Sequence, residues 1–171
     1  MQILLKDLQA TRDFANSLAA VILSDMHVIA RSETTKQSPC ASWVILLDGE
    51  MGSGKTTFTR EFGTALGIKE KITSPTFVGM HEYHTESLGF YHFDMYQVGI
   101  GLEDLAEIVE SDLPKVLVFE WSERLSAEQR KILSGLNILE IKLSAINDNE
   151  RLIEVSPHPL LSKLDLQSQE T

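Results

Sequence analysis

Apolar and polar positions follow two different periods along the chain, one typical of strands and one typical of helices. Residues 43–47 (Trp-Val-Ile-Leu-Leu) and 116–119 (Val-Leu-Val-Phe) are continuous apolar runs, which predict strands buried on both faces. Residues 3–5 predict a short strand near the start of the chain. Apolar residues at helical spacing over 8–22, with Asp7 as a cap, predict a helix directly after it.

The remaining elements follow from the same two periods and from turn residues. Helices are predicted over 58–66, 102–110 and 126–133, the first ended by Gly67 and the last begun by a capping box at Ser126. Strands are predicted over 77–83, 89–94, 136–143 and 151–155, the first two as an antiparallel hairpin. The mixture indicates an α/β fold: a sheet with a parallel core and antiparallel flanking strands, covered by helices on both faces.

The length of 171 residues fits a single domain, which we place at residues 1–156. Residues 31–42 are polar and are interpreted as a flexible surface loop. Residues 157–171 show no strong pattern and are interpreted as a loosely held C-terminal tail.

Composition narrows the location and the direct partners. No apolar run is long enough for a membrane span, no signal peptide is evident, and Cys40 is alone, so we expect a cytoplasmic protein without a disulfide. Asp and Glu outnumber Lys and Arg by 25 to 15, which gives a formal net charge of −10. This charge argues against direct binding of DNA or RNA, so any role in nucleic-acid chemistry would depend on a partner that holds the nucleic acid.

The strongest motif lies between the strand at 43–47 and the helix at 58–66. Residues 49–57 read Gly-Glu-Met-Gly-Ser-Gly-Lys-Thr-Thr and fit the phosphate-binding pattern G-x-x-x-x-G-K-[ST] in its strand–loop–helix context. Backbone N–H groups would surround phosphate oxygens, Lys55 would reach the β- and γ-phosphates, and Thr56 would offer a hydroxyl to Mg²⁺. The pattern predicts binding of ATP or GTP. The predicted contacts are Gly49, Met51, Gly52, Ser53, Gly54, Lys55, Thr56 and Thr57.

Two acidic residues end apolar strands and are candidates to complete such a site. Glu120 follows the strand at 116–119, and Asp94 ends the strand at 89–94. Either carboxylate could hold Mg²⁺ directly or through water, or orient the attacking water. Ser74 and Thr76 lie where hydroxyls could sense the γ-phosphate. Judged alone, Trp121 reads as a core side chain.

Three histidines, His81, His84 and His92, occur in the predicted hairpin. We interpret them as surface or sheet-edge residues and not as a metal cluster, because no cysteine or helical spacing supports ligation.

Taken in order, four motifs resemble the TsaE family, formerly YjeE: the phosphate loop, Ser-Pro-Thr-Phe at 74–77, Tyr-His-Phe-Asp-Met-Tyr at 91–96 and Phe-Glu-Trp-Ser-Glu at 119–123. The resemblance covers about residues 3–155. It strengthens the case for Ser74, Thr76, Asp94 and Trp121 as nucleotide-site residues, and Arg151 is a further candidate for contact with the nucleotide. Gln97 stands where the family usually has Arg, and Ser122 where it often has Pro.

The resemblance implies a Mg²⁺-dependent ATPase that supports synthesis of tRNA threonylcarbamoyladenosine (t6A) together with TsaD and TsaB. It implies that tRNA is contacted only through that assembly. Lys55, Asp94 and Glu120 would be catalytic, with Thr56, Asp94 and Glu120 around the metal. Because no arginine finger is evident, hydrolysis by the isolated protein is expected to be slow.

Two other functions stay open on the residues alone. One is a small-molecule kinase, although no arginine cluster typical of a substrate lid follows the second apolar strand. The other is a nucleotide-dependent binding module without relevant turnover. Inorganic phosphate as the only second product would oppose the kinase, and a Glu120 variant that binds ATP without hydrolysing it tests the binding module.

Overall fold

The computed structural model describes residues 1–32 and 42–164, and seven strands in that part of the chain form one mixed sheet. The strand order is β1-β7-β6-β2-β5-β4-β3. The bounds are β1 Gln2–Leu5, β2 Ser42–Asp48, β3 Met80–His84, β4 Gly89–Asp94, β5 Lys115–Glu120, β6 Asn137–Ala145 and β7 Arg151–Val155. Strands β6, β2, β5 and β4 are parallel to one another. Strand β7 pairs antiparallel with β6, β3 pairs antiparallel with β4, and β1 pairs antiparallel with β7 at the outer edge. The predicted parallel core with antiparallel flanking strands is confirmed.

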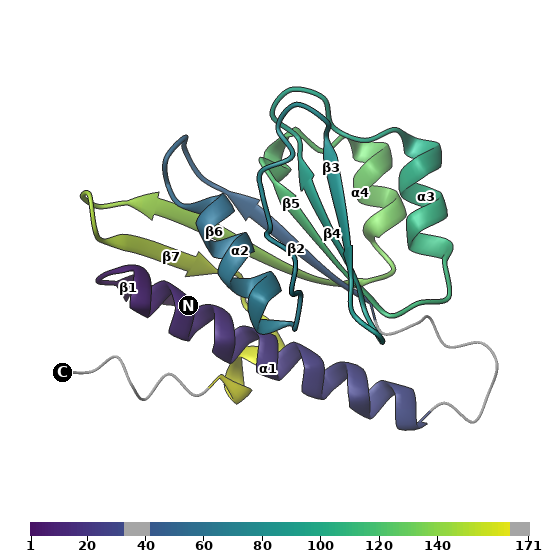
Figure 1. The fold of residues 1–171 in the computed structure, drawn as a ribbon, viewed down its shortest axis with the longest axis horizontal. Helices are drawn as coiled ribbons and strands as arrows, with labels where there is room; N and C mark the ends of the chain where they lie inside the picture. The colour runs from purple at the N-terminus through teal and green to yellow at the C-terminus, as the bar shows by residue number, and fades with distance from the viewer. Residues whose placement is uncertain (33–41, 165–171) are drawn as a thin grey trace.

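Helices cover both faces of this sheet, as predicted (Figure 1). On one face, α1 (Leu8–Ser32) and α2 (Lys55–Ala65) pack over a core that includes Phe14, Phe58 and Phe62. On the other face, α3 (Leu102–Glu110) and α4 (Ala127–Leu133) cover a second core around Phe93 and Phe119. Short 3₁₀ helices, η1 and η2, span Ser122–Arg124 and Pro159–Lys163.

Local signals explain where several elements begin and end. The Asp7 carboxylate accepts a hydrogen bond of 2.8 Å from the Ala10 N–H and caps α1, as predicted. Ser126 and Gln129 form the predicted capping box of α4. After α2, the chain turns at Gly67, whose φ of 96° is the left-handed conformation that glycine adopts most easily.

Several sequence predictions differ from the structure at their boundaries, most informatively at α1, at the loop before β2 and at β3. Helix α1 continues ten residues past the predicted end at 22. Burial of Met26, one turn beyond Ile22, explains the first part of this extension. The loop predicted at 31–42 overlaps both neighbouring elements, because α1 ends at Ser32 and β2 begins at Ser42. Residues 33–41 lie outside the described part of the chain. Strand β3 begins at Met80 and not at residue 77, because the preceding residues turn back on the carbonyl of Pro75.

The C-terminal segment is more ordered than its sequence suggests. Residues 159–163 form η2, and Leu160 is buried against the α1 side of the core. The interpretation of the whole segment 157–171 as a loosely held tail is therefore wrong for η2, and residues 165–171 lie outside the described part. No helix in the described residues combines the length and apolar character needed to cross a membrane.

The topology places the predicted site at one edge of the sheet. Strands β2, β5 and β4 are parallel neighbours, so their carboxyl ends meet, and Asp94 lies directly opposite Glu120 in the register. Leu47 at the end of β2 is the partner of Glu120 on its other side. Ligands of open α/β sheets bind outside this edge, and the predicted phosphate-binding loop leaves β2 there.

Candidate functional site

The glycine-rich loop between β2 and α2 forms a cradle of backbone groups. Gly49, Gly52 and Gly54 all have positive φ, at 142°, 79° and 104°. At Gly49 a Cβ would also overlap the carbonyl oxygen of Leu143, so only glycine fits there. Helix α2 begins with Gly54 as its N-cap and has no side-chain cap, which leaves its first N–H groups for a ligand.

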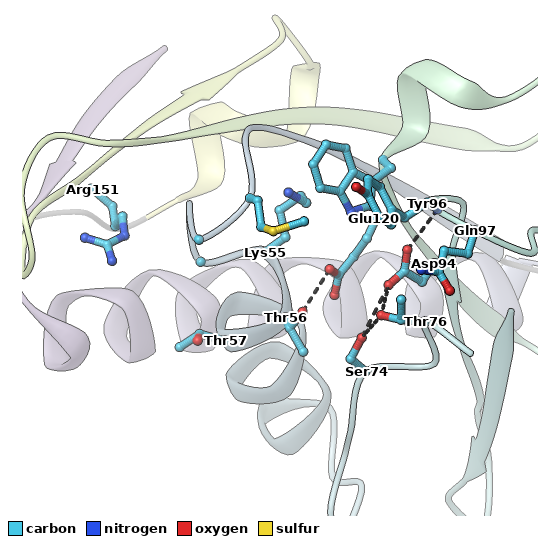
Figure 2. A pocket seen from close by; sticks show the side chains of 14 residues that line it. Lys55, Thr56, Thr57, Ser74, Thr76, Asp94, Tyr96, Gln97, Glu120 and Arg151 are labelled. Carbon is cyan, nitrogen blue, oxygen red and sulfur yellow. Dashed lines mark hydrogen bonds between the residues drawn. The ribbon is translucent and has the colours of Figure 1, made fainter. Parts of the chain in front are cut away.

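A cavity of about 450 Å³ opens above this loop (Figure 2). Its lining includes most of the residues that the sequence predicted for nucleotide and metal. They are Met51, Gly52, Gly54, Lys55, Thr56, Thr57, Ser74, Thr76, Asp94, Glu120, Trp121 and Arg151. Gly49 and Ser53 belong to the loop but do not line the cavity. The assignment of roles to these residues stays a prediction, although the fold brings them together.

Glu120 is the most enclosed carboxylate of the cavity, with 2% of its surface exposed. Its Oε2 accepts a hydrogen bond of 2.9 Å from the hydroxyl of Thr56 at the start of α2. Its Oε1 lies 2.7 Å from His92 Nε2 and 3.4 Å from the Thr59 hydroxyl. The carboxylate is therefore held from three sides, with Oε2 beside the loop threonine.

Asp94 organises the neighbouring corner of the cavity. Its Oδ2 accepts hydrogen bonds from the hydroxyls of Thr76 at 2.5 Å and Ser74 at 3.3 Å, which contact each other at 2.6 Å. Its Oδ1 accepts the Tyr96 N–H at 2.9 Å (Figure 2). These bonds tie the Ser-Pro-Thr segment to the end of β4, so both candidate sensor hydroxyls lie at the carboxylate predicted to approach the metal.

Lys55 is buried beside the loop from which it comes. Its Nζ donates to the carbonyls of Gly49 at 2.5 Å and Glu50 at 3.0 Å, and lies 3.8 Å from the ring centre of Trp121. Burial lowers the pKa of Lys55, and the nearby carboxylates, with Glu120 foremost, oppose that change. Few water contacts compete for this ammonium, so an anion placed in the cavity would interact with it strongly.

Trp121 has an unusual backbone conformation that places its ring over the cavity. Among the described residues it is the non-glycine residue with positive φ, at 59°. Its ring packs against Tyr96 at a centroid distance of 4.9 Å. Arg124 stacks on the Tyr96 ring at 4.7 Å and donates to the Tyr96 carbonyl at 2.6 Å. Trp121 also packs against the second core, so the interpretation of this residue as core, made from the residue alone, holds in part and lacks only its contact with Lys55.

Arg151 approaches the loop from the start of β7. Its guanidinium lies near Gly54, at the end of the cavity formed by the glycine-rich loop (Figure 2). One nitrogen donates to the carbonyls of Asn147 at 2.7 Å, Glu150 at 3.0 Å and Asp148 at 3.3 Å. The side chain is therefore braced by the β6–β7 turn while its charge faces the loop.

The sequence analysis did not assign to the site four residues that the structure places in or beside it. Tyr96 and Gln97 line the cavity, and Asp48 lies at the end of β2 under the loop. The fourth is His92, whose side chain is fully buried against Glu120, so the interpretation of this histidine as a surface or edge residue is wrong. One signal could have found it: His92 lies two residues before Asp94 in the same predicted strand and therefore on the same face as that candidate carboxylate.

We expect His92 to be required for stability, because it holds a buried carboxylate. Replacing His92 by Phe leaves Glu120 without its closest partner, which should lower the free energy of unfolding by about 1–3 kcal/mol. Urea denaturation measures this difference. His84→Phe is the matched control in the same hairpin, since His84 is half-exposed, and should change the value by less than about 0.5 kcal/mol. Equal effects of the two substitutions would contradict the role of His92.

Beneath the loop, Asp48 accepts hydrogen bonds from the Ser122 hydroxyl at 2.5 Å and the Glu123 N–H at 3.0 Å. Burial, followed by the contact with Asp48, raises the pKa of Glu123. At a pH just above 4.5, the ordinary pKa of a glutamate, the Glu123 carboxyl therefore keeps its proton in the folded state and loses it in the unfolded chain. The resulting stabilisation is present below pH 4.5 and is lost as the pH rises through the folded pKa.

Glu123→Gln removes this pH dependence. We expect the variant to gain melting temperature relative to the unmodified chain at pH 7, and the gain to shrink toward pH 4. Thermal unfolding over this range checks it. Glu128→Gln should show the opposite trend, because hydrogen bonds from its own backbone N–H and then from Ser126 lower the pKa of Glu128. A gain in melting temperature for Glu123→Gln that is the same at every pH would contradict a raised pKa of Glu123.

Comparisons with known proteins match most of the chain. A family model described as "Threonylcarbamoyl adenosine biosynthesis protein TsaE" matches residues 5–153. A tRNA threonylcarbamoyladenosine biosynthesis protein TsaE from a Nostoc species is 35% identical over 123 residues, which cover 68% of this chain and 72% of that protein. The Bacillus subtilis protein of the same name is 34% identical over 128 residues, 70% and 81% of the two chains. The crystal structure of Bacillus subtilis YdiB superposes with a TM-score of 0.63 at 25% identity, covering 96% of this chain and 93% of that one.

Proposed function

Because the chain belongs to the TsaE family, we propose that it is a Mg²⁺-dependent ATPase that supports tRNA threonylcarbamoyladenosine biosynthesis. The observation that carries the chemical part is the contact between Thr56 and Glu120 beneath the uncapped start of α2. A loop threonine and a strand-end carboxylate are the protein groups that hold Mg²⁺ in phosphate-loop enzymes.

The residues present fit a nucleotide phosphate and a magnesium ion. Helix α2 begins at Lys55 without a side-chain cap, so its first N–H groups are available to donate to a phosphate. Positive-φ glycines and the dipole of α2 favour an anion in the cradle. Thr56 and Glu120 would hold the magnesium ion, with Asp94 opposite Glu120 in the register. Bound Mg²⁺ would neutralise phosphate charge that develops during hydrolysis.

The chain's own residues divide the remaining tasks. The loop N–H groups and Lys55 bind phosphate oxygens and stabilise negative charge as the terminal bond breaks. Asp94, already the acceptor for Ser74 and Thr76, is placed to accept a hydrogen bond from the attacking water. Arg151 reaches the cavity, but one nitrogen of its guanidinium already donates hydrogen bonds to carbonyls of the β6–β7 turn. We therefore expect slow hydrolysis until a partner orders the site.

The partners that we propose are TsaD and TsaB, with the transfer chemistry in TsaD and with tRNA contacted through the complex. The formal net charge of −10 supports an indirect relation to tRNA, because a chain of this charge is poorly suited to bind a polyanion by itself.

Reconstitution tests the proposal. Purified protein is incubated with ATP and Mg²⁺, with and without TsaB, TsaD and substrate tRNA, and both phosphate release and modified tRNA are measured. We expect slow release alone, faster release with the partners, and t6A formation over repeated turnovers only in the complete mixture. Identical phosphate release and t6A formation with and without this protein would overturn the proposal, and a phosphorylated metabolite would favour a kinase instead.

A further inference from the structure

A second hollow of about 820 Å³ lies on the α3 face of the sheet, between the β3–β4 hairpin and helix α3. We call it the α3 groove. Met80 and Tyr91 line it from the two strands of the hairpin, and Ile108 lines it from α3. Its remaining apolar lining comes from Val78, Val98 and Ile100, which lie in the loops on either side. The α3 groove is separate from the nucleotide cavity and is not used in the mechanism above.

The α3 groove is bordered by apolar side chains that the fold leaves in water. Val78 and Val98 are each 61% exposed, and the adjacent Phe77 is 85% exposed. Exposed apolar side chains that cluster at a hollow mark an interaction site more often than isolated ones do. Strand β3 also ends the sheet, so the described residues provide no strand partner for its outer edge. Both features indicate that this side of the molecule is covered by something outside the described chain.

The charge of the α3 groove determines what kind of partner fits. Its lining holds three carboxylates, Glu82, Asp104 and Glu107, and no basic side chain. Burial first, and then the contact with Glu82, raise the pKa of Tyr91 to about 12, so its hydroxyl keeps its proton at neutral pH. Nucleic acid and acidic surfaces are repelled by such a rim, and a second copy of this chain, at −10 net charge, is a poor complement. A basic segment with apolar anchor residues complements both the acidic lining of the α3 groove and its exposed apolar border.

The loops beside the α3 groove continue into the nucleotide cavity. Phe77 and Val78 follow Thr76 directly, and Val98 follows Gln97, another cavity residue. The two loops pack closely, since a Cβ at Gly79 would overlap the carbonyl oxygen of Gly99. The Gly79 carbonyl also accepts a hydrogen bond of 3.0 Å from the Asp94 N–H. A protein bound to Val78 and Val98 would therefore contact the segments that position Thr76 and Asp94.

We propose that the α3 groove is the docking site for a basic, apolar-anchored segment of a partner protein, and that docking there orders the Thr76 and Gln97 loops of the nucleotide site. This inference rests on the proposed function, because it assigns a surface to the partner which that function requires.

The test measures binding of the purified TsaD–TsaB pair to the full chain by calorimetry with ATP and Mg²⁺. Glu107→Lys changes the charge of the groove and Val98→Glu its apolar border, and each should weaken binding at least about tenfold. Glu110→Lys is the matched charge control on the exposed surface of the same helix outside the groove lining, and Leu4→Glu is the apolar control on the opposite sheet edge. Both controls should stay within about twofold.

Nucleotide affinity of the isolated protein should be the same for Glu107→Lys and the unmodified chain, which shows that the fold and the phosphate site are intact. Groove variants that bind the pair as tightly as the controls would overturn the docking site and leave the proposed function standing. Failure of the unmodified chain to bind the pair would overturn the partner assignment and this inference with it. Self-association that Val98→Glu abolishes, seen by sedimentation, would assign the groove to a second copy instead.

Discussion

Lys55→Ala should reduce ATP hydrolysis by at least about 100-fold, the loss typical when one preorganised charge-stabilising donor is removed. The Lys55 ammonium is buried and lies 3.8 Å from the centre of the Trp121 ring. Arg151, the other cation of the cavity lining, is held by carbonyls of the β6–β7 turn. Without Lys55, the carboxylates of Glu120 and Asp94 face the incoming phosphates with no neighbouring ammonium to offset them. Nucleotide binding should weaken together with turnover.

Phosphate release and nucleotide affinity are measured on the same preparation, and circular dichroism and thermal melting confirm the fold. Lys69→Ala, at an exposed lysine just after α2, is the matched control and should hydrolyse ATP normally. Hydrolysis by Lys55→Ala within a factor of a few of the unmodified chain would rule out a phosphate-binding role for Lys55 and weaken the whole ATPase proposal.

Glu120→Gln should separate nucleotide binding from turnover. The amide keeps the shape of Glu120 and can still accept from Thr56, but it removes the negative charge that a magnesium ion requires. Loss of a charged contact worth about 1.5–3 kcal/mol corresponds to roughly 10- to 100-fold weaker Mg²⁺ binding. We expect hydrolysis to fall by at least that factor, while Mg²⁺-free nucleotide binding changes little.

Titrations of nucleotide with and without Mg²⁺ measure the two binding affinities, and phosphate release measures the hydrolysis rate. Glu120→Ala is the harsher comparison, because it also leaves His92 buried without its partner and should lower stability. Glu128→Gln serves as a surface control, since Glu128 lies on α4, away from the cavity lining. If Glu120→Gln binds ATP, fails to hydrolyse it and still supports t6A formation, ATP binding and not hydrolysis is what the pathway needs.

Local patterns determined most of the secondary structure. The apolar runs at 43–47 and 116–119 became β2 and β5, and the predicted helix over 102–110 has the same bounds as α3. Capping residues fixed the starts of α1 and α4, because their hydrogen bonds span only three residues. Two predictions failed for different reasons. A local turn onto the Pro75 carbonyl delays the start of β3, and η2 depends on burial of Leu160 against a distant part of the chain.

The sequence by itself predicted the phosphate-binding loop, because that motif is a contiguous stretch whose glycines act through local backbone geometry. It also placed Asp94 and Glu120 at strand ends. Only the tertiary structure decided that these two are direct neighbours, since their meeting depends on the parallel register of β4 and β5. The same register buried His92 against Glu120, and the packing of loops far apart in sequence formed the α3 groove. Such relations depend on strand order and long-range packing, which no short sequence pattern encodes.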